Sequence, residues 1–307
     1  MIALAGMAIF AHSALGSGYQ GFAISYAVFF SILTFLWWRT GVHDPEHRST
    51  SLPYALAFLA TTILYFVSAF LQPQIAFIIW GIGTVFSIFL PLILTTLNTS
   101  VDPEHREMAQ RIQPSLVERF GLLTIIVLGE VIVAVVSGAS HFKHFDVYHL
   151  LMVFLGMFIA IGMWWVYFDF VSHHSPIQKT HTRFAWLYLH LPITMSIALT
   201  GAGVLLLLEH AVLTTGMQWL LVGSLGVFLL AVATMVGVIE MDKDHELIHK
   251  RGAAVAILAA FGMFALGFMP VDRFSLLLLI CLFLMMPILF AFSMWAYGLM
   301  HDDYHSH

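Results

Sequence analysis

Charged residues are scarce in this chain. Lys, Arg, Asp and Glu make up 9% of its 307 residues, whereas 60% are hydrophobic and the mean hydropathy is +0.92. Soluble domains carry about a quarter charged residues, so this composition excludes water as the main solvent. The net charge of −5 is small and spread over short segments, which gives no basic surface for nucleic acid. We therefore expect an integral membrane protein that binds no nucleic acid.

Cysteine is nearly absent as well. The single cysteine, Cys281, falls within an apolar run, so the chain cannot form an intrachain disulfide. A cysteine in such a run is typical of a small residue that packs against helices or lipid.

Long apolar runs follow one another along most of the chain. A bilayer core of about 30 Å needs about 20 apolar residues per helix, and the backbone within it must satisfy its own hydrogen bonds. The runs therefore predict an all-α, polytopic bundle of about ten transmembrane helices, in a single integral membrane domain over residues 1–307. The predicted spans cover residues 1–13, 20–38, 52–71, 74–97, 119–138, 148–169, 184–208, 217–240, 252–268 and 273–299.

The basic residues predict the orientation of these spans. Cytoplasmic loops of membrane proteins carry an excess of Lys and Arg. Only Lys143 and Arg273 fall on one side of the predicted bundle. The other side holds the remaining basic residues, which are Arg39, Arg48, Arg106, Arg111, Arg119, Lys179, Arg183, Lys243, Lys250 and Arg251. We therefore expect a multi-pass protein of the cell (inner) membrane with its C-terminus in the cytoplasm.

Glu130 is the clearest ionisable residue at membrane depth. At 1.5 Å per residue it lies about 16 Å along its helix from Arg119, near the bilayer centre. Eleven residues at 100° each return to within about 20° of the same direction, so Arg119 and Glu130 share a helix face with Leu123 and Ile126. A charged group at this depth costs about 2.5–3.5 kcal/mol, so we expect this face to turn towards the bundle interior or a wet cavity.

Glu130 has two readings. It can be a proton or cation site whose pKa is raised by desolvation. Alternatively, it is a protonated carboxyl that bonds a neighbouring helix and only holds the packing. Gly129, next to it, is expected to let a neighbouring backbone approach closely.

Other polar residues are candidates for the same pathway. His190 lies about two turns into its predicted span beside Pro192, which frees a backbone carbonyl, and broken helices of this kind often line transporter sites. The alternative is a histidine bonded into the kink. Asp169 lies at the cytoplasmic end of a span, as an interface anchor, a partner for Arg119 or Arg183, or part of a pathway. Glu118 and Arg119 can equally be a snorkelling pair.

Several of the seventeen histidines have the spacing of metal ligands. His245 and His249 are four residues apart around Glu246, as in zinc proteases, and His173 and His174 lie in another predicted cytoplasmic loop. Histidine clusters on one membrane face are also typical of iron-dependent desaturases and hydroxylases. Because the zinc-like motif lies in a predicted short charged loop without an obvious third ligand, solvated loop histidines are the favoured interpretation, and no cofactor is expected.

Three central segments resemble a known family. They are the run from Glu118 to Leu122 with Thr124 to Glu130, the run from Trp164 to Asp169, and the run from Tyr188 to Pro192. In this order and spacing they resemble the bacterial low temperature requirement protein A family. The resemblance implies a multispanning membrane protein linked to growth in the cold, without an established substrate. Members usually open with an acidic Glu-Leu-Phe-Phe-Asp helix and a tryptophan-rich helix; this sequence shows neither, so we expect that it lacks those first helices.

The favoured function is a transporter or channel for a small solute or ion, with Glu130 titrating inside and His190 and Asp169 on the same pathway. Its expected partners are the lipid bilayer and that solute or ion, and a homo-oligomer is left open. One alternative is a membrane-embedded, metal-dependent enzyme that modifies lipid. Another is a structural or regulatory membrane protein of cold adaptation.

Overall fold

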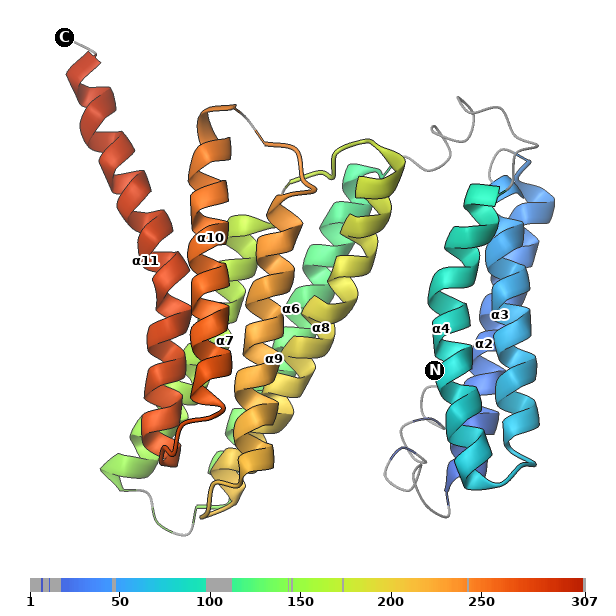
Figure 1. The fold of residues 1–307 in the computed structure, drawn as a ribbon, viewed down its shortest axis with the longest axis horizontal. Helices are drawn as coiled ribbons and strands as arrows, with labels where there is room; N and C mark the ends of the chain where they lie inside the picture. Colours follow the sequence, from blue (N-terminus) through green and yellow to red (C-terminus); the bar gives the residue numbers. More distant parts are fainter. Residues whose placement is uncertain are drawn as a thin grey trace. The chain divides into compact units, whose positions relative to one another are not determined.

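The structure is a computed structural model that describes residues 7, 11, 18–45, 48–97, 112–142, 144, 146–172, 174–241 and 243–305. Nine helices lie within these residues (Figure 1), and each is long and apolar enough to cross a membrane. They are α2 (Tyr19–His43), α3 (Arg48–Ser68), α4 (Pro73–Leu97), α6 (Pro114–Ala139), α7 (Val147–Phe170), α8 (Thr180–Glu209), α9 (Thr215–Val236), α10 (Lys243–Leu266) and α11 (Arg273–His305). The prediction of an all-α, polytopic membrane bundle is confirmed.

The nine helices correspond to nine of the ten predicted spans. The first predicted span, 1–13, lies outside the described residues apart from positions 7 and 11. Several helices extend past the predicted ends; α6, for example, begins at Pro114 instead of residue 119. Proline is favoured in the first turn of a helix because its missing N–H would have no partner there. Apolar runs mark the hydrocarbon core, whereas the hydrogen-bonded backbone continues into the interface.

The chain forms two compact units, residues 1–111 and 112–307. In the first, α3 contacts both α2 and α4. Its centre is aromatic: the buried Tyr65 ring stacks on Tyr26 at 5.0 Å and on Trp80 at 6.0 Å between centroids. The prediction of a single domain stays a prediction.

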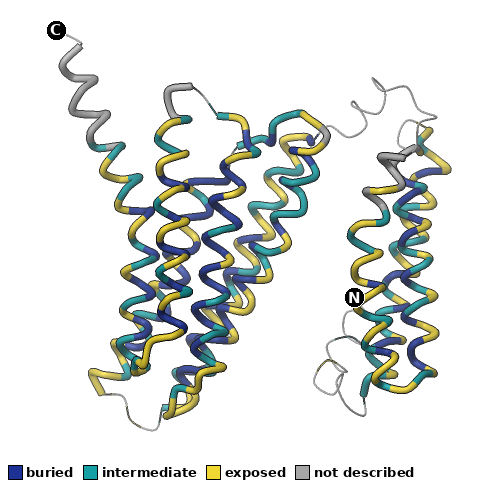
Figure 2. The backbone as a smooth tube through the Cα atoms, viewed as in Figure 1, coloured by how far each residue is buried: buried dark blue, intermediate teal, exposed yellow. Residues whose placement is uncertain are grey.

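The second unit is a ring of six helices. Contacts follow the order α6, α8, α9, α10, α11 and α7, and α7 closes the ring by contacting α6. Among these helices α9 is the most buried, as the dark blue trace in Figure 2 shows. Large side chains that fill the interior include Met163, Trp186, Ile193, Leu225 and Phe228.

Polar groups at the helix ends fix where these helices start and stop. Asp146 caps α7 by accepting a hydrogen bond from the backbone N–H of His149, at 2.9 Å. At the C-terminal end of α8, the Arg273 guanidinium donates hydrogen bonds to the carbonyl oxygens of Leu207, at 3.2 Å, and His210, at 2.6 Å. The last carbonyl groups of a helix have no N–H partner within it, so Arg273 supplies the missing donors. Arg273, an exception to the basic-side pattern, therefore has a structural task.

Successive helices of the second unit run in opposite directions (Figure 1). The starts of α6, α8 and α10 therefore share one face with the ends of α7, α9 and α11. The described basic residues near that face are Arg119, Lys179, Arg183, Lys243, Lys250 and Arg251, whereas Arg273 begins α11 on the opposite face. The alternation used to predict the orientation is thus present in the second unit. That the basic face is cytoplasmic stays a prediction.

Candidate functional site

Glu130 lies on the outer surface of the second unit. Arg119, Leu123, Ile126 and Glu130 do share one face of α6, but all four are exposed there, Ile126 to 69%. The opposite face packs inward through Thr124, Leu128, Val131, Ala134 and Val135. This face therefore does not turn into the interior of the second unit, and the alternative expectation, a wet cavity, stays a prediction. The buried residues of α6 form its wider apolar face. The helix is rotated so that this face packs inward, which leaves Glu130 outside.

A close contact between α6 and α8 fixes this rotation. A Cβ atom placed on Gly201 of α8 would lie 3.4 Å from the Glu130 carbonyl oxygen and from the Val131 backbone. The two backbones approach closely because Gly201 has no side chain. The inner side of residues 130 and 131 is thus occupied by α8, and the Glu130 side chain points away from it. We predicted this role for Gly129, but Gly129 faces open space.

His190 lies deep inside the second unit, where it is 2% exposed. Its Nδ1 is 2.8 Å from the Trp186 carbonyl oxygen, and its Nε2 is 3.1 Å from the Tyr167 hydroxyl. The rings of Phe120 and Trp186 cover it, with centroids 4.3 and 4.5 Å away. His190 therefore joins α6, α7 and α8 through one buried polar contact and several aromatic ones.

The partners of His190 fix its tautomer. A carbonyl oxygen only accepts hydrogen bonds, so Nδ1 carries a proton and donates to Trp186. In the neutral ring, Nε2 is then an acceptor for the Tyr167 hydroxyl, whose residue is 1% exposed. Thr124, fully buried on α6, also interacts with the Tyr167 side chain. This arrangement matches the expected histidine bonded into its helix, although α8 passes through Pro192 as one continuous helix and is not broken.

Asp169 lies at the end of α7 on the basic face, where it is exposed. The imidazoles of His249 and His174 interact electrostatically with its carboxyl group. The predicted pairing with Arg119 or Arg183 stays a prediction. The two imidazole centroids are 5.5 Å apart in an edge-to-face arrangement. Tertiary packing thus joins residues from the end of α7, the following loop and α10.

The structure describes only some of the candidate metal ligands. His173 and the side chain of His245 lie outside the described residues. Among the residues that are described, no group of three or more His, Cys, Asp and Glu side chains could hold a metal ion. His245 to His249 belong to the first turns of α10, which begins at Lys243, so the prediction of a loop there was wrong. In this helix, residues 245 and 249 are four positions apart and therefore lie on the same face.

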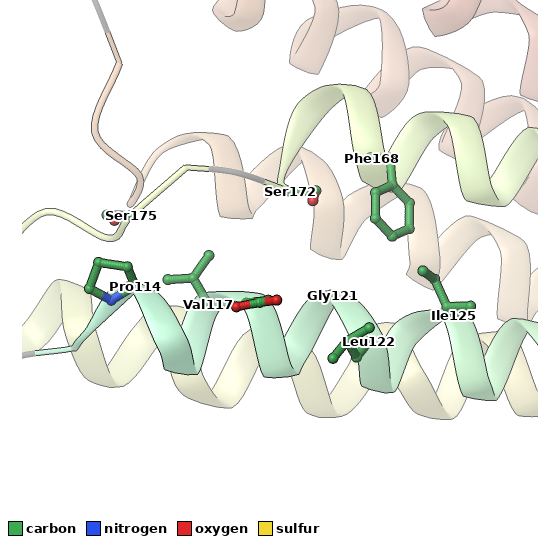
Figure 3. A pocket seen from close by; sticks show the side chains of 9 residues that line it. Pro114, Val117, Gly121, Leu122, Ile125, Phe168, Ser172 and Ser175 are labelled. Atoms are coloured by element: carbon green, nitrogen blue, oxygen red, sulfur yellow. The ribbon is translucent and has the colours of Figure 1, made fainter.

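Glu118 lines a cavity of about 470 Å³ between the start of α6 and the end of α7. Figure 3 shows side chains of both segments turned towards this space. Among the described residues that line it, Glu118 is the only one with an ionisable side chain. The others are Pro114, Val117, Gly121, Leu122, Ile125, Phe168, Ser172 and Ser175. Arg119, one residue later, points to the face shared with Glu130.

The predicted site residues thus occupy different places. His190 is in the core, Glu130 is on the outer face of α6, Glu118 is in the cavity, and Asp169 is beside the histidines. Sequence reasoning missed Tyr167 and Gly201. Tyr167 offered a signal, because a phenol within an apolar span needs a hydrogen-bond partner. Gly201 offered none, since the sequence does not show which backbone a glycine contacts.

The apolar helices and their antiparallel arrangement define a multispanning membrane protein. Residues 1–296 match the family model of the bacterial low temperature requirement A protein (LtrA), so the chain belongs to this family. The resemblance inferred from the central motifs is confirmed. A search of curated proteins and a search of solved structures each found no match.

Proposed function

We propose that this membrane protein transports, or conducts, a small solute or ion, and that Glu130 lines the polar route. The observation that carries the proposal is the position of Glu130 at mid-span on an outward face of α6. An ionisable group left against hydrocarbon costs about 2.5–3.5 kcal/mol, which a polar route removes. Residues of this kind are typical of ion and proton pathways in membranes.

The surroundings of Glu130 support a defined position for the carboxyl. It is about 16 Å along α6 from Arg119 and about 15 Å from Ser140, so both membrane surfaces are remote. Gly201 holds the backbone of residue 130 against α8. The backbone that carries the carboxyl therefore has a fixed depth along α6. His190 and Tyr167, bonded to each other in the interior, then support the α6, α7 and α8 framework behind it.

Orientation and assembly are part of the proposal. The protein would lie in the bacterial inner membrane with the basic face and the C-terminus in the cytoplasm, because ten basic residues favour that side. A homo-oligomer is compatible with the exposed α6 face, since helix contacts in membranes often bury polar side chains.

Proton and cation flux into liposomes tests the proposal. The full chain is reconstituted with a pH-sensitive dye inside, a membrane potential is imposed, and proton entry is recorded in Na⁺ and in K⁺. We expect flux above protein-free liposomes and its loss in Glu130→Gln. Glu240→Gln, which removes an exposed carboxyl after α9, is the matched control. Flux that is equal in the wild type and in a correctly folded Glu130→Gln variant would refute the role of Glu130.

A further inference from the structure

The cavity beside Glu118 has a polar end and an apolar end. Glu118, Ser172 and Ser175 supply oxygen atoms near the start of α6 and the end of α7. Leu122 and Ile125, deeper along α6, are both exposed on the unit's surface. From Pro114 to Ile125 the cavity follows α6 for about 16 Å, roughly half the hydrocarbon core. It is therefore long enough to cross one leaflet, and its polar end lies near the start of α6 and the end of α7.

The charge at the polar end selects among amphipathic molecules. Glu118 is the only ionisable group among the lining residues that the structure describes, so its carboxylate supplies the only formal charge among them. A carboxylate accepts hydrogen bonds and pairs with an ammonium group, whereas it repels an anionic one. The two serine hydroxyls can accept a hydrogen bond or donate one to a phosphate oxygen. The volume of about 470 Å³ lies within the range of small-molecule sites.

We propose that this cavity binds one membrane phospholipid with a primary-amine headgroup, of the ethanolamine type. The ammonium pairs with Glu118 and the serine hydroxyls bond the phosphate. An acyl chain lies along Leu122, Ile125 and the ring of Phe168. The cavity faces the layer in which such lipids are dissolved, and its polar end is at headgroup depth. This site is independent of the Glu130 pathway.

Lipid titration of the delipidated full-length protein, followed by native mass spectrometry, tests the site. The probes are lipids with the same acyl chains and ethanolamine, choline or glycerol headgroups. We expect the ethanolamine lipid to bind at least about tenfold more tightly than the choline lipid, since a quaternary ammonium cannot donate hydrogen bonds. The glycerol lipid, which is anionic, should bind more weakly still.

Two variants separate headgroup recognition from chain binding. Glu118→Gln should abolish the preference for ethanolamine, whereas Glu209→Gln, at the opposite face, should keep it. Ile125→Trp fills the apolar end and should lower binding of all three lipids. Val133→Trp adds the same bulk to an exposed position further along α6 and should not. Equal binding of the three lipids by the wild type, or a preference that survives Glu118→Gln, would overturn the proposal. Circular dichroism confirms that each variant is helical before it is compared.

Discussion

Replacing Tyr167 with phenylalanine removes one hydroxyl from a fully buried polar contact of the second unit. The ring of Tyr167 stays, so packing against its neighbours is preserved. What is lost is the hydrogen bond to Nε2 of His190, 3.1 Å away, together with the interaction with Thr124. Because His190 is 2% exposed, no bulk water replaces the lost donor.

The size of the effect follows from what is left without a partner. An unsatisfied buried acceptor costs about 1–3 kcal/mol in soluble proteins. Hydrogen bonds between membrane helices contribute less, about 0.6 kcal/mol on average and about 1.7 kcal/mol at most. We therefore expect Tyr167→Phe to lower the free energy of unfolding by about 1 kcal/mol. His190→Leu should cost more, because it also alters the contacts with Phe120 and Trp186.

A double-mutant cycle isolates the Tyr167–His190 pair. Unfolding is followed by circular dichroism in mixed detergent micelles for the wild type, Tyr167→Phe, His190→Leu and the double variant. Because the double variant removes both partners of the Tyr167–His190 bond together, its cost should be smaller than the sum of the two single costs by about 0.6–1.7 kcal/mol. Tyr148→Phe, at an exposed position of α7, should change stability by less than about 0.5 kcal/mol. Strictly additive costs would show that the two side chains do not stabilise each other.

Three further predictions concern helix ends and close packing. Arg273→Gln should destabilise the second unit by about 1 kcal/mol in chemical unfolding, since the α8 carbonyls lose a charged donor; an unchanged midpoint would contradict this capping role. Gly201→Ala should be tolerated, because its Cβ would make ordinary contacts at 3.4 Å, whereas Gly201→Leu should cost about 1–3 kcal/mol in the same assay. The backbone N–H of His149 lowers the pKa of Asp146, so the cap stabilises α7 above the ordinary carboxyl pKa and is lost as the pH falls through the lowered one. Wild type and Asp146→Ala should thus differ in melting temperature at neutral pH and converge in strong acid; a constant difference would refute the linkage.

The amino-acid sequence by itself determined the solvent of this protein, its helices and the family to which it belongs. The apolar runs are long enough to cross a bilayer, and within it the backbone must satisfy its own hydrogen bonds, which a helix does. Nine of the ten predicted spans match helices. The angular relation between Arg119 and Glu130 was also predictable, because helical periodicity is a local property. The motif around Glu118 to Glu130 was specific enough to identify the family.

Only the tertiary structure decided which way those faces point. The direction of the Glu130 face depends on how α6 packs against α8, and Gly201, seventy-one positions later, sets that contact. The hydrogen bond between Tyr167 and His190 likewise joins two helices. The electrostatic interaction of Asp169 with His174 and His249 also joins separate segments of the chain. Packing of this kind depends on how the surfaces of different helices fit together. The periodicity within one helix shows which residues share a face, but not which helix that face contacts.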